Sequence, residues 1–278
     1  MSIADEILSK AVLPTSLSSR EIRAEIAEAL RRRSVFSARV TSAEYLQQLR
    51  EKLAKAAAGK MSPESVRIML QAALRDMGYT PEGGFPDDDD AVPPAEAGTL
   101  RDISSAARIK LQVDTAQRQG ASLKLKAMGF NGAALYTHPG WRFTRRQGRK
   151  TAREWGVRWY HAGNAVGWEG AAKTEMVALK DSPIWEALGE GEGGSESAYT
   201  DTLGTDFPPF AFNSGMEWER ADRATCIRLG LIDGDYDPKP LRVRPGELAG
   251  LSEAEVDSAT GRLTPEFRAA ILKEMEDW

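Results

Sequence analysis

The segment from Gly204 to Ile232 constrains the fold more than any other part of the sequence, because two consecutive prolines lie among its phenylalanines. Proline fixes the backbone φ angle and has no amide hydrogen to donate, so this segment cannot form a central strand of a sheet. We expect an extended arm that is fastened by its aromatic rings. Asn213-Ser214-Gly215 predicts a turn after the arm, and apolar spacing from Trp218 to Leu231 predicts a helix.

Two interpretations of this arm are open. Such a segment is commonly a loop that wraps the core of its own domain. Alternatively, it docks onto a partner, because aromatic side chains supply large contact areas and a stiffened arm loses less entropy on binding. The candidate docking residues are Phe207, Pro208, Pro209, Phe210, Phe212 and Trp218.

Residues 1–79 predict a helical module. Ser18 with Glu21, and Thr41 with Glu44, have the spacing of a capping box. The pair Ser62-Pro63 places an N-cap before a proline at the first helical position. Apolar residues follow each of these signals at helical spacing, so we expect antiparallel helices joined by short turns over about residues 18–78.

Residues 80–99 differ in composition, with four aspartates, four prolines and three glycines. So few apolar residues cannot form a core, and we expect an acidic linker that divides the chain. The run Asp87 to Asp90 could bind a divalent cation, but it lacks the spaced ligands, turn glycine and distal glutamate of an EF-hand. We therefore predict no metal site and no cofactor.

Residues 100–232 predict a mixed domain built on a long helix that begins at Thr99 or Leu100 and ends between Gly129 and Gly132. Short strands or irregular, aromatic-rich segments are expected after it. Residues 233–278 predict a loop and two terminal helices, at about 253–259 and 265–277. The predicted fold class is therefore α+β and mostly α, with a helical N-terminal module before the mixed domain.

Residues 142–158 form a basic stretch with interleaved tryptophans. Arginine makes bidentate contacts with phosphate, and aromatic rings stack on bases, so this stretch is a candidate nucleic-acid site. The alternative is that its arginines pair with the acids of the protein itself, and the net charge of −4 favours no general attraction to nucleic acid. The candidate contact residues are Arg142, Arg145, Arg146, Arg149, Lys150 and Arg153.

No catalytic signature is visible in the sequence. There is one cysteine, Cys226, within an apolar helical pattern, and there are two histidines, so a structural zinc site of the usual type cannot be assembled. Phosphate-binding loops and nucleophile elbows are also absent. We expect a protein that is not an enzyme, although a hydrolase or transferase with unidentified catalytic residues stays open. No apolar run is long enough to span a membrane, so no membrane partner is expected.

Two motifs, taken in their order along the chain, resemble those of a known family. The first is Ala107-Arg108-Ile109 followed by Val113-Asp114-Thr115-Ala116-Gln117, and the second is the proline-containing arm followed by Asn213-Ser214-Gly215-Met216 and Trp218. After a helical N-terminal region, this arrangement resembles the phage head morphogenesis family, the Mu F-like minor head proteins. The residues that stand for the family's helix motif are Arg108, Asp114, Thr115 and Gln117.

The resemblance is to a divergent branch and covers roughly residues 100–232. Gln112, Val113 and Asp114 stand where the family has Arg, Thr and Glu, and Phe207-Pro208-Pro209-Phe210 replaces a His-Pro-x-Cys arm. It implies a low-copy virion component in the phage head or neck, assembled in the bacterial host cytoplasm. The implied partners are the portal protein, the major capsid protein or both, with DNA as a further candidate.

Overall fold

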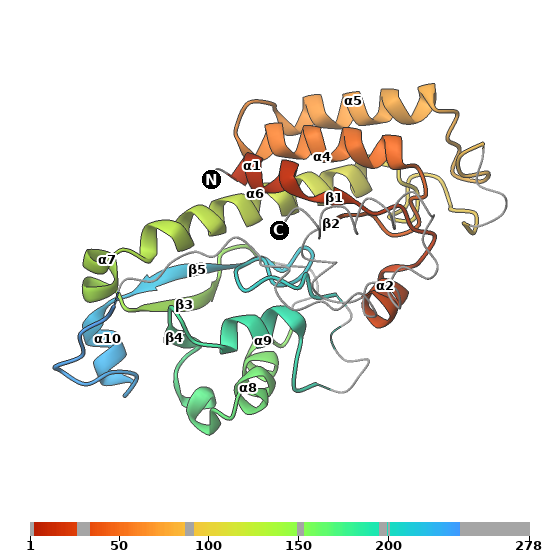
Figure 1. Ribbon diagram of the computed structural model, residues 1–278. Coiled ribbons are helices and arrows are strands. Elements are labelled where there is room, and N and C mark those ends of the chain that lie inside the picture. Colours follow the sequence, from red (N-terminus) through yellow and green to blue (C-terminus); the bar gives the residue numbers. More distant parts are fainter. Residues whose placement is uncertain are drawn as a thin grey trace, which may run out of the picture. The chain divides into compact units, whose positions relative to one another are not determined.

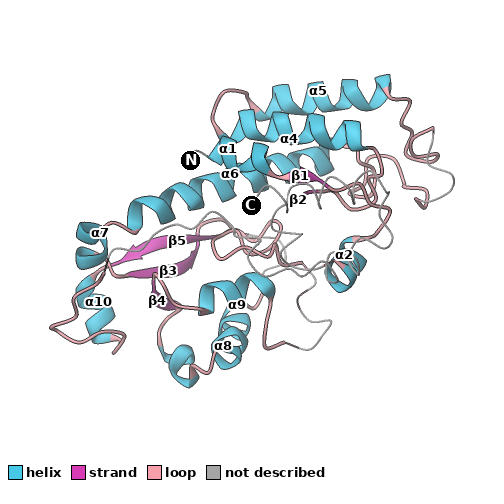
Figure 2. Cartoon of the chain, in the orientation of Figure 1, coloured by secondary structure: helices cyan, strands magenta, loops and turns pink. Residues whose placement is uncertain are grey.

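A computed structural model of the chain describes residues 3–26, 34–86, 92–148, 153–194, 199 and 201–239. Helices make up most of its regular structure and the sheets are small, so the predicted α+β, mostly α class is confirmed (Figures 1 and 2). The chain divides into two compact units between Gln117 and Arg118. This boundary falls within a helix, whereas the sequence predicts the division at residues 80–99.

The first unit is mainly helical. Its short strands β1 (Ala11–Val12) and β2 (Ser34–Val35) pair in parallel. Its helices are α1 (Ile3–Ser9), α2 (Ser19–Glu25), α4 (Ala43–Ala57), α5 (Pro63–Asp76) and the first part of α6 (Ala106–Gly129).

The predicted N-terminal signals are largely correct. Ser18 forms the capping box with Glu21, and Ser62 caps α5 with Pro63 in its first turn. The cap of α4 is Ser42 rather than Thr41, and its hydroxyl accepts the Tyr45 amide hydrogen at 3.1 Å. Thr41 and Ser42 are both residue types that can cap a helix, and the spacing to Glu44 alone did not show which of the two does so.

Helices α4 and α5 pack against each other, and α5 lies on the outside of this unit (Figure 1). Their apolar faces share one core with two residues of α6, Ile109 and Val113. Phe85 belongs to the same core and contacts Tyr45 and Tyr79, at centroid distances of 6.3 and 5.2 Å. The prediction that residues 80–99 bury almost nothing is therefore wrong at Phe85, while Asp87 to Asp90 lie outside the described residues.

Helix α6 begins at Ala106, later than the predicted Thr99 or Leu100. The preceding residues form turns in which the Asp102 carboxylate accepts the amide hydrogens of Gly98 and Ser104, both at 2.8 Å. Aspartate commonly competes for backbone donors in this way, which favours a turn over a helix.

The second unit combines short helices with a small sheet. Its strands are β3 (Gly140–Arg145), β4 (Val177–Leu179) and β5 (Met216–Ala221). They form an antiparallel sheet in the order β4-β3-β5. Its helices, besides the end of α6, are α7 (Gly132–Thr137), α8 (Trp155–Ala165), the 3-10 helix η1 (Glu169–Lys173), α9 (Ile184–Glu190) and α10 (Arg223–Arg228).

The prediction that Trp218 begins a helix is wrong. Residues Met216 to Ala221 form β5, and Trp218 points into the core while Glu217 and Glu219 are partly exposed. This alternation has the period of a strand, which the helical interpretation overlooked. The helix begins only at Arg223, where the Asp222 carboxylate caps it by accepting the Thr225 amide hydrogen at 2.7 Å. The predicted helices at 253–259 and 265–277 lie outside the described residues.

An aromatic core fills the second unit. Trp141 on β3 stacks on Trp218 on β5, with ring centroids 5.1 Å apart and planes 7° from parallel. The indole N–H groups of Trp159 and Trp185 donate to the carbonyl oxygens of Ala171 and Leu179, both at 2.8 Å. These two large rings are therefore buried with their polar groups satisfied. None of the described helices is long and apolar enough to cross a membrane.

Lys180 is buried at the end of α6, with 3% of its surface exposed. Its ammonium group donates to the carbonyl oxygens of Gly129 (3.0 Å) and Ala134 (3.2 Å) and lies 4.5 Å from the Trp141 ring. Gly129 leaves room for that ring, because a Cβ atom there would lie 2.6 Å from it. Burial, together with the smaller effect of the nearby Arg220, lowers the pKa of Lys180 from 10.5 to about 8.

We predict that this buried amine makes stability rise with pH. Between about pH 8 and 10.5 the unfolded chain binds the Lys180 proton and the folded chain does not, so raising the pH through this window favours the folded state. Relative to Lys180→Met, the wild-type free energy of unfolding should increase by about 1–3 kcal/mol from pH 7 to 10. Urea unfolding of both proteins at each pH measures this, and parallel pH profiles would contradict it.

Candidate docking surface

The proline-containing arm forms a closed loop in the second unit. An antiparallel bridge joins Thr202 to Ala211, and the Leu203 amide donates to the Phe210 carbonyl oxygen at 2.9 Å. Further along the loop, Asp206 forms an ion pair with Lys126 on α6. The loop is therefore fastened at its base and along its length, and it ends in the predicted turn, where Asn213 and Gly215 have positive φ angles.

Most of the predicted docking residues belong to the core. Pro208, Pro209 and Phe210 are buried in the loop, and Trp218 is buried on β5. The Phe210 ring contacts Phe143 edge-on at 5.1 Å, and Trp185 stacks beside it at 6.3 Å. A docking role for these four residues is therefore wrong in this fold, because the rings are needed to cover the small sheet.

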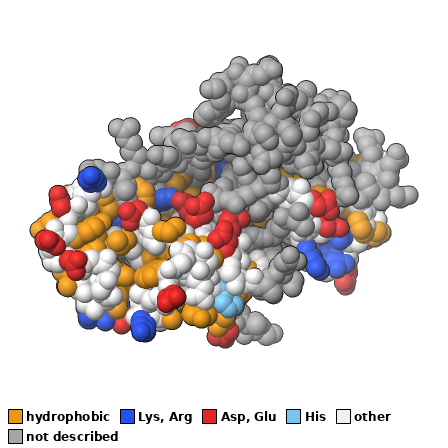
Figure 3. Space-filling model, turned by 60° about the horizontal axis from the view of Figure 1, so that its bottom comes forward, with side chains coloured by type: hydrophobic (Ala, Val, Ile, Leu, Met, Phe, Trp, Pro, Cys, Tyr) orange, Lys and Arg blue, Asp and Glu red, His pale blue; other side chains and the backbone are white. Residues whose placement is uncertain are grey.

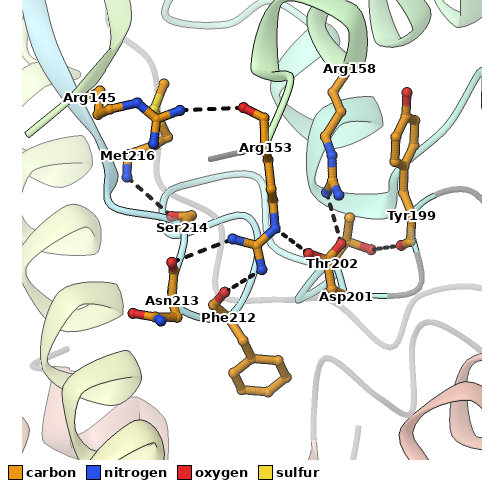
Figure 4. A network of polar contacts seen from close by, with 10 residues as sticks. All are labelled: Arg145, Arg153, Arg158, Tyr199, Asp201, Thr202, Phe212, Asn213, Ser214 and Met216. Atoms are coloured by element: carbon orange, nitrogen blue, oxygen red, sulfur yellow. Dashed lines mark hydrogen bonds and ion pairs between the residues drawn. The ribbon is translucent and has the colours of Figure 1, made fainter. Parts of the chain in front are cut away.

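The two remaining phenylalanines of the arm differ from Phe210. Phe207 packs against the core while partly exposed, and Lys126 lies 5.9 Å from the centre of its ring. Phe212 is 36% exposed, and Figure 4 shows its ring pointing away from the polar contacts that hold its backbone. Of the predicted docking set, Phe212 therefore offers the most accessible apolar side chain.

We predict that Phe210→Ala lowers the free energy of unfolding by about 3–5 kcal/mol, because it leaves a cavity against Phe143 and Trp185. Phe212→Ala is the matched control, since it removes the same ring from a partly exposed position and should cost less than about 1 kcal/mol. Urea unfolding of the three proteins measures both values. Equal losses would mean that Phe210 does not have the core role assigned to it.

The arginines of the basic stretch hold the arm in place (Figure 4). Arg153 forms an ion pair with Asp201 and donates to the carbonyl oxygens of Phe212 (2.7 Å) and Asn213 (3.4 Å). Arg158, on α8, reaches the other Asp201 oxygen at 2.9 Å. One carboxylate thus joins two arginines and fixes the start of the arm beside α8.

Tyr199 and His161 extend this network. The Arg158 guanidinium lies 4.4 Å from the centre of the Tyr199 ring, and the Tyr199 hydroxyl is 2.8 Å from Nδ1 of His161. Burial raises the pKa of Asp201, but the hydrogen bonds and charges of Arg158 and Arg153 outweigh it and leave that pKa below its ordinary value of 3.8. Asp201 is therefore ionised at neutral pH and balanced by its partners.

The other described members of the basic stretch also have partners within the protein. Arg142 pairs with Glu175 at 3.4 Å, Arg146 pairs with Glu219 at 2.7 Å, and Arg145 donates to the Arg153 carbonyl oxygen at 3.3 Å. This favours pairing with the protein's own acids over the nucleic-acid interpretation. The other two candidates, Arg149 and Lys150, lie outside the described residues.

We predict that Asp201→Asn lowers the free energy of unfolding by about 1–3 kcal/mol at pH 7, because it leaves two partly buried arginines without a counter-charge. The folded pKa of Asp201 is depressed, so its stabilising effect is present above pH 3.8 and is lost as the pH falls through the folded pKa. The difference from wild type should therefore shrink towards pH 3. Glu219→Gln, in a more exposed pair, is the control and should cost less than about 1 kcal/mol at pH 7. A loss at Asp201 that is constant with pH would contradict the ion-pair role.

The residues of the family-motif helix have local structural contacts in α6. Arg108 donates to the Leu100 carbonyl oxygen and the Ser37 hydroxyl, both at 2.7 Å. Asp114 pairs with Lys110 at 2.7 Å, and the Thr115 hydroxyl donates to the Leu111 carbonyl oxygen at 2.7 Å. Gln117 is partly buried at the end of the first unit. Arg108 is thus the one that ties α6 to distant parts of the chain.

Cys226 has the environment of a structural residue. It is buried beside Val177 and Ala221, and burial raises the pKa of its thiol to about 11. A thiol with a raised pKa is a poor nucleophile at neutral pH. Among the described residues there is no group of three histidine, cysteine, aspartate or glutamate side chains that could hold a metal ion.

Helix α8 presents apolar side chains that the sequence interpretation did not single out. Trp155, Trp159 and Ala162 face the core, whereas Val157 and Tyr160 are 49% and 46% exposed on the outward side. Figure 3 shows hydrophobic side chains over much of the described surface in the left half of its view. The helical spacing of Trp155 and Trp159 is the sequence signal for this outward face, although the neighbouring arginines are equally typical of a phosphate-binding segment.

No model of a known protein family matches the chain. Comparisons with curated proteins and with solved structures likewise give no similar protein. The candidate docking surface is a set of exposed apolar side chains of the second unit: Val157 and Tyr160 on α8, and Phe212 on the arm, whose carbonyl oxygen accepts a hydrogen bond from Arg153.

Proposed function

We propose that the protein is a minor head protein of a phage virion, a structural component that acts in head morphogenesis near the portal vertex. It joins the head or neck during assembly in the bacterial host cytoplasm. Its partner is the portal protein, the major capsid protein or both, and its role is docking rather than catalysis. The order of the motif helix, the tryptophan-containing segment and the proline-containing arm over residues 100–232 supports this proposal.

The observation that carries docking is the candidate docking surface, Val157, Tyr160 and Phe212. Tyrosine is enriched at the centres of protein interfaces, because its ring adds apolar area while its hydroxyl keeps a hydrogen bond. The backbone under these side chains is held by Trp155 and Trp159 in the core and by the Arg153 contacts. A surface held in this way loses little entropy when a partner binds.

The double variant Val157→Ser with Tyr160→Ser tests the proposal. We expect it to fold with a melting temperature close to wild type, because both side chains are about half exposed. Its incorporation into phage particles, measured by quantitative immunoblotting of purified heads, should fall at least about tenfold, which corresponds to a loss of roughly 1.4 kcal/mol of binding free energy.

Asn164→Ser is the matched control, because Asn164 is exposed on the same helix and carries no apolar surface. It should enter particles normally. Wild-type levels of the double variant in heads would exclude this surface as the docking site. Normal assembly, packaging and infection by particles that lack the protein altogether would overturn the head-protein proposal itself.

A further inference from the structure

A small hollow lies on the first unit, where the end of α5 meets the turns before α6. Its walls are apolar at Val92, Pro93 and Ile103, and two arginines, Arg39 and Arg101, also line it. Its free volume is about 10 Å³, which is roughly the room that one water molecule needs. The hollow can therefore receive a single small polar group at its mouth, and not a whole organic ligand.

Three other arginines of this unit have side-chain partners, whereas Arg39 and Arg101, like the exposed Arg20 and Arg75, have none among the described residues. Arg50 donates to the Lys10 carbonyl oxygen at 2.8 Å, Arg67 pairs with Glu64, and Arg108 has the contacts described above. Within the described part of the chain, neither Arg39 nor Arg101 forms a hydrogen bond or ion pair through its side chain. Among the described residues, no acceptor of the chain therefore takes up their guanidinium donors.

The backbone at Arg39 is held in an uncommon conformation. Its φ angle is +62°, a left-handed value that costs a residue other than glycine roughly 1–2 kcal/mol. Hydrogen bonds on both sides impose it: the Arg39 amide donates to the Leu17 carbonyl oxygen at 2.9 Å, and the Val40 carbonyl oxygen accepts the Thr15 amide hydrogen at 2.7 Å. Outliers that the surrounding structure enforces are concentrated at functional sites, which makes Arg39 a candidate ligand-contacting residue.

From these three observations we infer that the mouth of the hollow is an oxyanion site: Arg39 and Arg101 bind free phosphate or the phosphate group of a small molecule there, and the hollow itself admits only one of its oxygens. The planar guanidinium group matches phosphate oxygens with paired hydrogen bonds. Two arginines that have no ion-pair partner among the described residues favour a group with two negative charges over a single carboxylate. This site is independent of the candidate docking surface.

Titration calorimetry of the full chain with inorganic phosphate tests the inference, with matched ionic strength and sodium chloride as the blank. Phosphate should bind the wild-type protein, and Arg39→Gln or Arg101→Gln should weaken binding at least tenfold. Arg75→Gln is the matched control, because Arg75 is an exposed arginine of α5 that does not line the hollow. Its affinity should equal that of wild type. Circular dichroism without phosphate establishes that each variant is folded.

Further ligands and one further variant separate the alternatives. Acetate should bind more weakly than phosphate, and a phosphate monoester such as glycerol phosphate should bind as free phosphate does. Absence of phosphate binding to folded wild type, or equal loss in Arg75→Gln, would overturn the inference. Binding of duplex DNA without binding of phosphate would also overturn it. Phosphate binding that occurs only after Asp87 to Asp90 are changed to asparagine would overturn it as well, since Arg39 and Arg101 would then pair with these aspartates in the wild-type chain. Particle incorporation is a separate readout, so failure here leaves the docking proposal standing.

Discussion

The second unit depends on contacts between large aromatic rings across a very small sheet. Strand β4 has only three residues, and the sheet has three strands, so backbone pairing alone gives limited stability. The stacked pair Trp141 and Trp218 joins the central strand to its neighbour, and Phe143 is enclosed by Trp155 and Phe210. Each buried ring of this size removes some 150–250 Å² from water. The loop that contains Phe210 is consequently part of the core.

Ion pairs hold the basic stretch in its position in the second unit. Asp201 sits between Arg153 and Arg158, and Glu175 sits between Arg142 and Arg228. Each carboxylate therefore ties together segments that are far apart in the sequence, and the arginines fix the arm and α10 to the sheet. Exposed pairs such as those of Glu175 contribute little individually, whereas the partly buried Asp201 pairs also satisfy backbone carbonyl groups at Phe212 and Asn213. The arginines that most suggested an external ligand are thus used largely inside the unit.

The sequence predicted features that depend on neighbouring residues. Ser18 and Ser62 were identified as caps because a cap and its helix are adjacent, and the α6 stripe through Ile109 and Val113 follows from helical periodicity. The predictions from the sequence were wrong where the position of a side chain depends on residues far away in the chain. Whether Phe210 is core or surface depends on Phe143, and whether Arg153 is free depends on Asp201. The prediction of a helix at Trp218 was wrong for a different reason: the six-residue strand β5 is followed almost at once by α10, so the two apolar patterns run together in the sequence.

The contact of Gly129 with Trp141 and Lys180 links three positions that no local motif connects. A methyl group at position 129 would collide with the indole ring, and the carbonyl oxygen of the same residue receives the buried ammonium group. A substitution at any one of these positions therefore changes which residues fit at the other two. In the divergence of this protein the three should vary as a set: a larger residue at 129 would require a smaller ring at 141, and loss of that ring would remove the face on which the lysine rests.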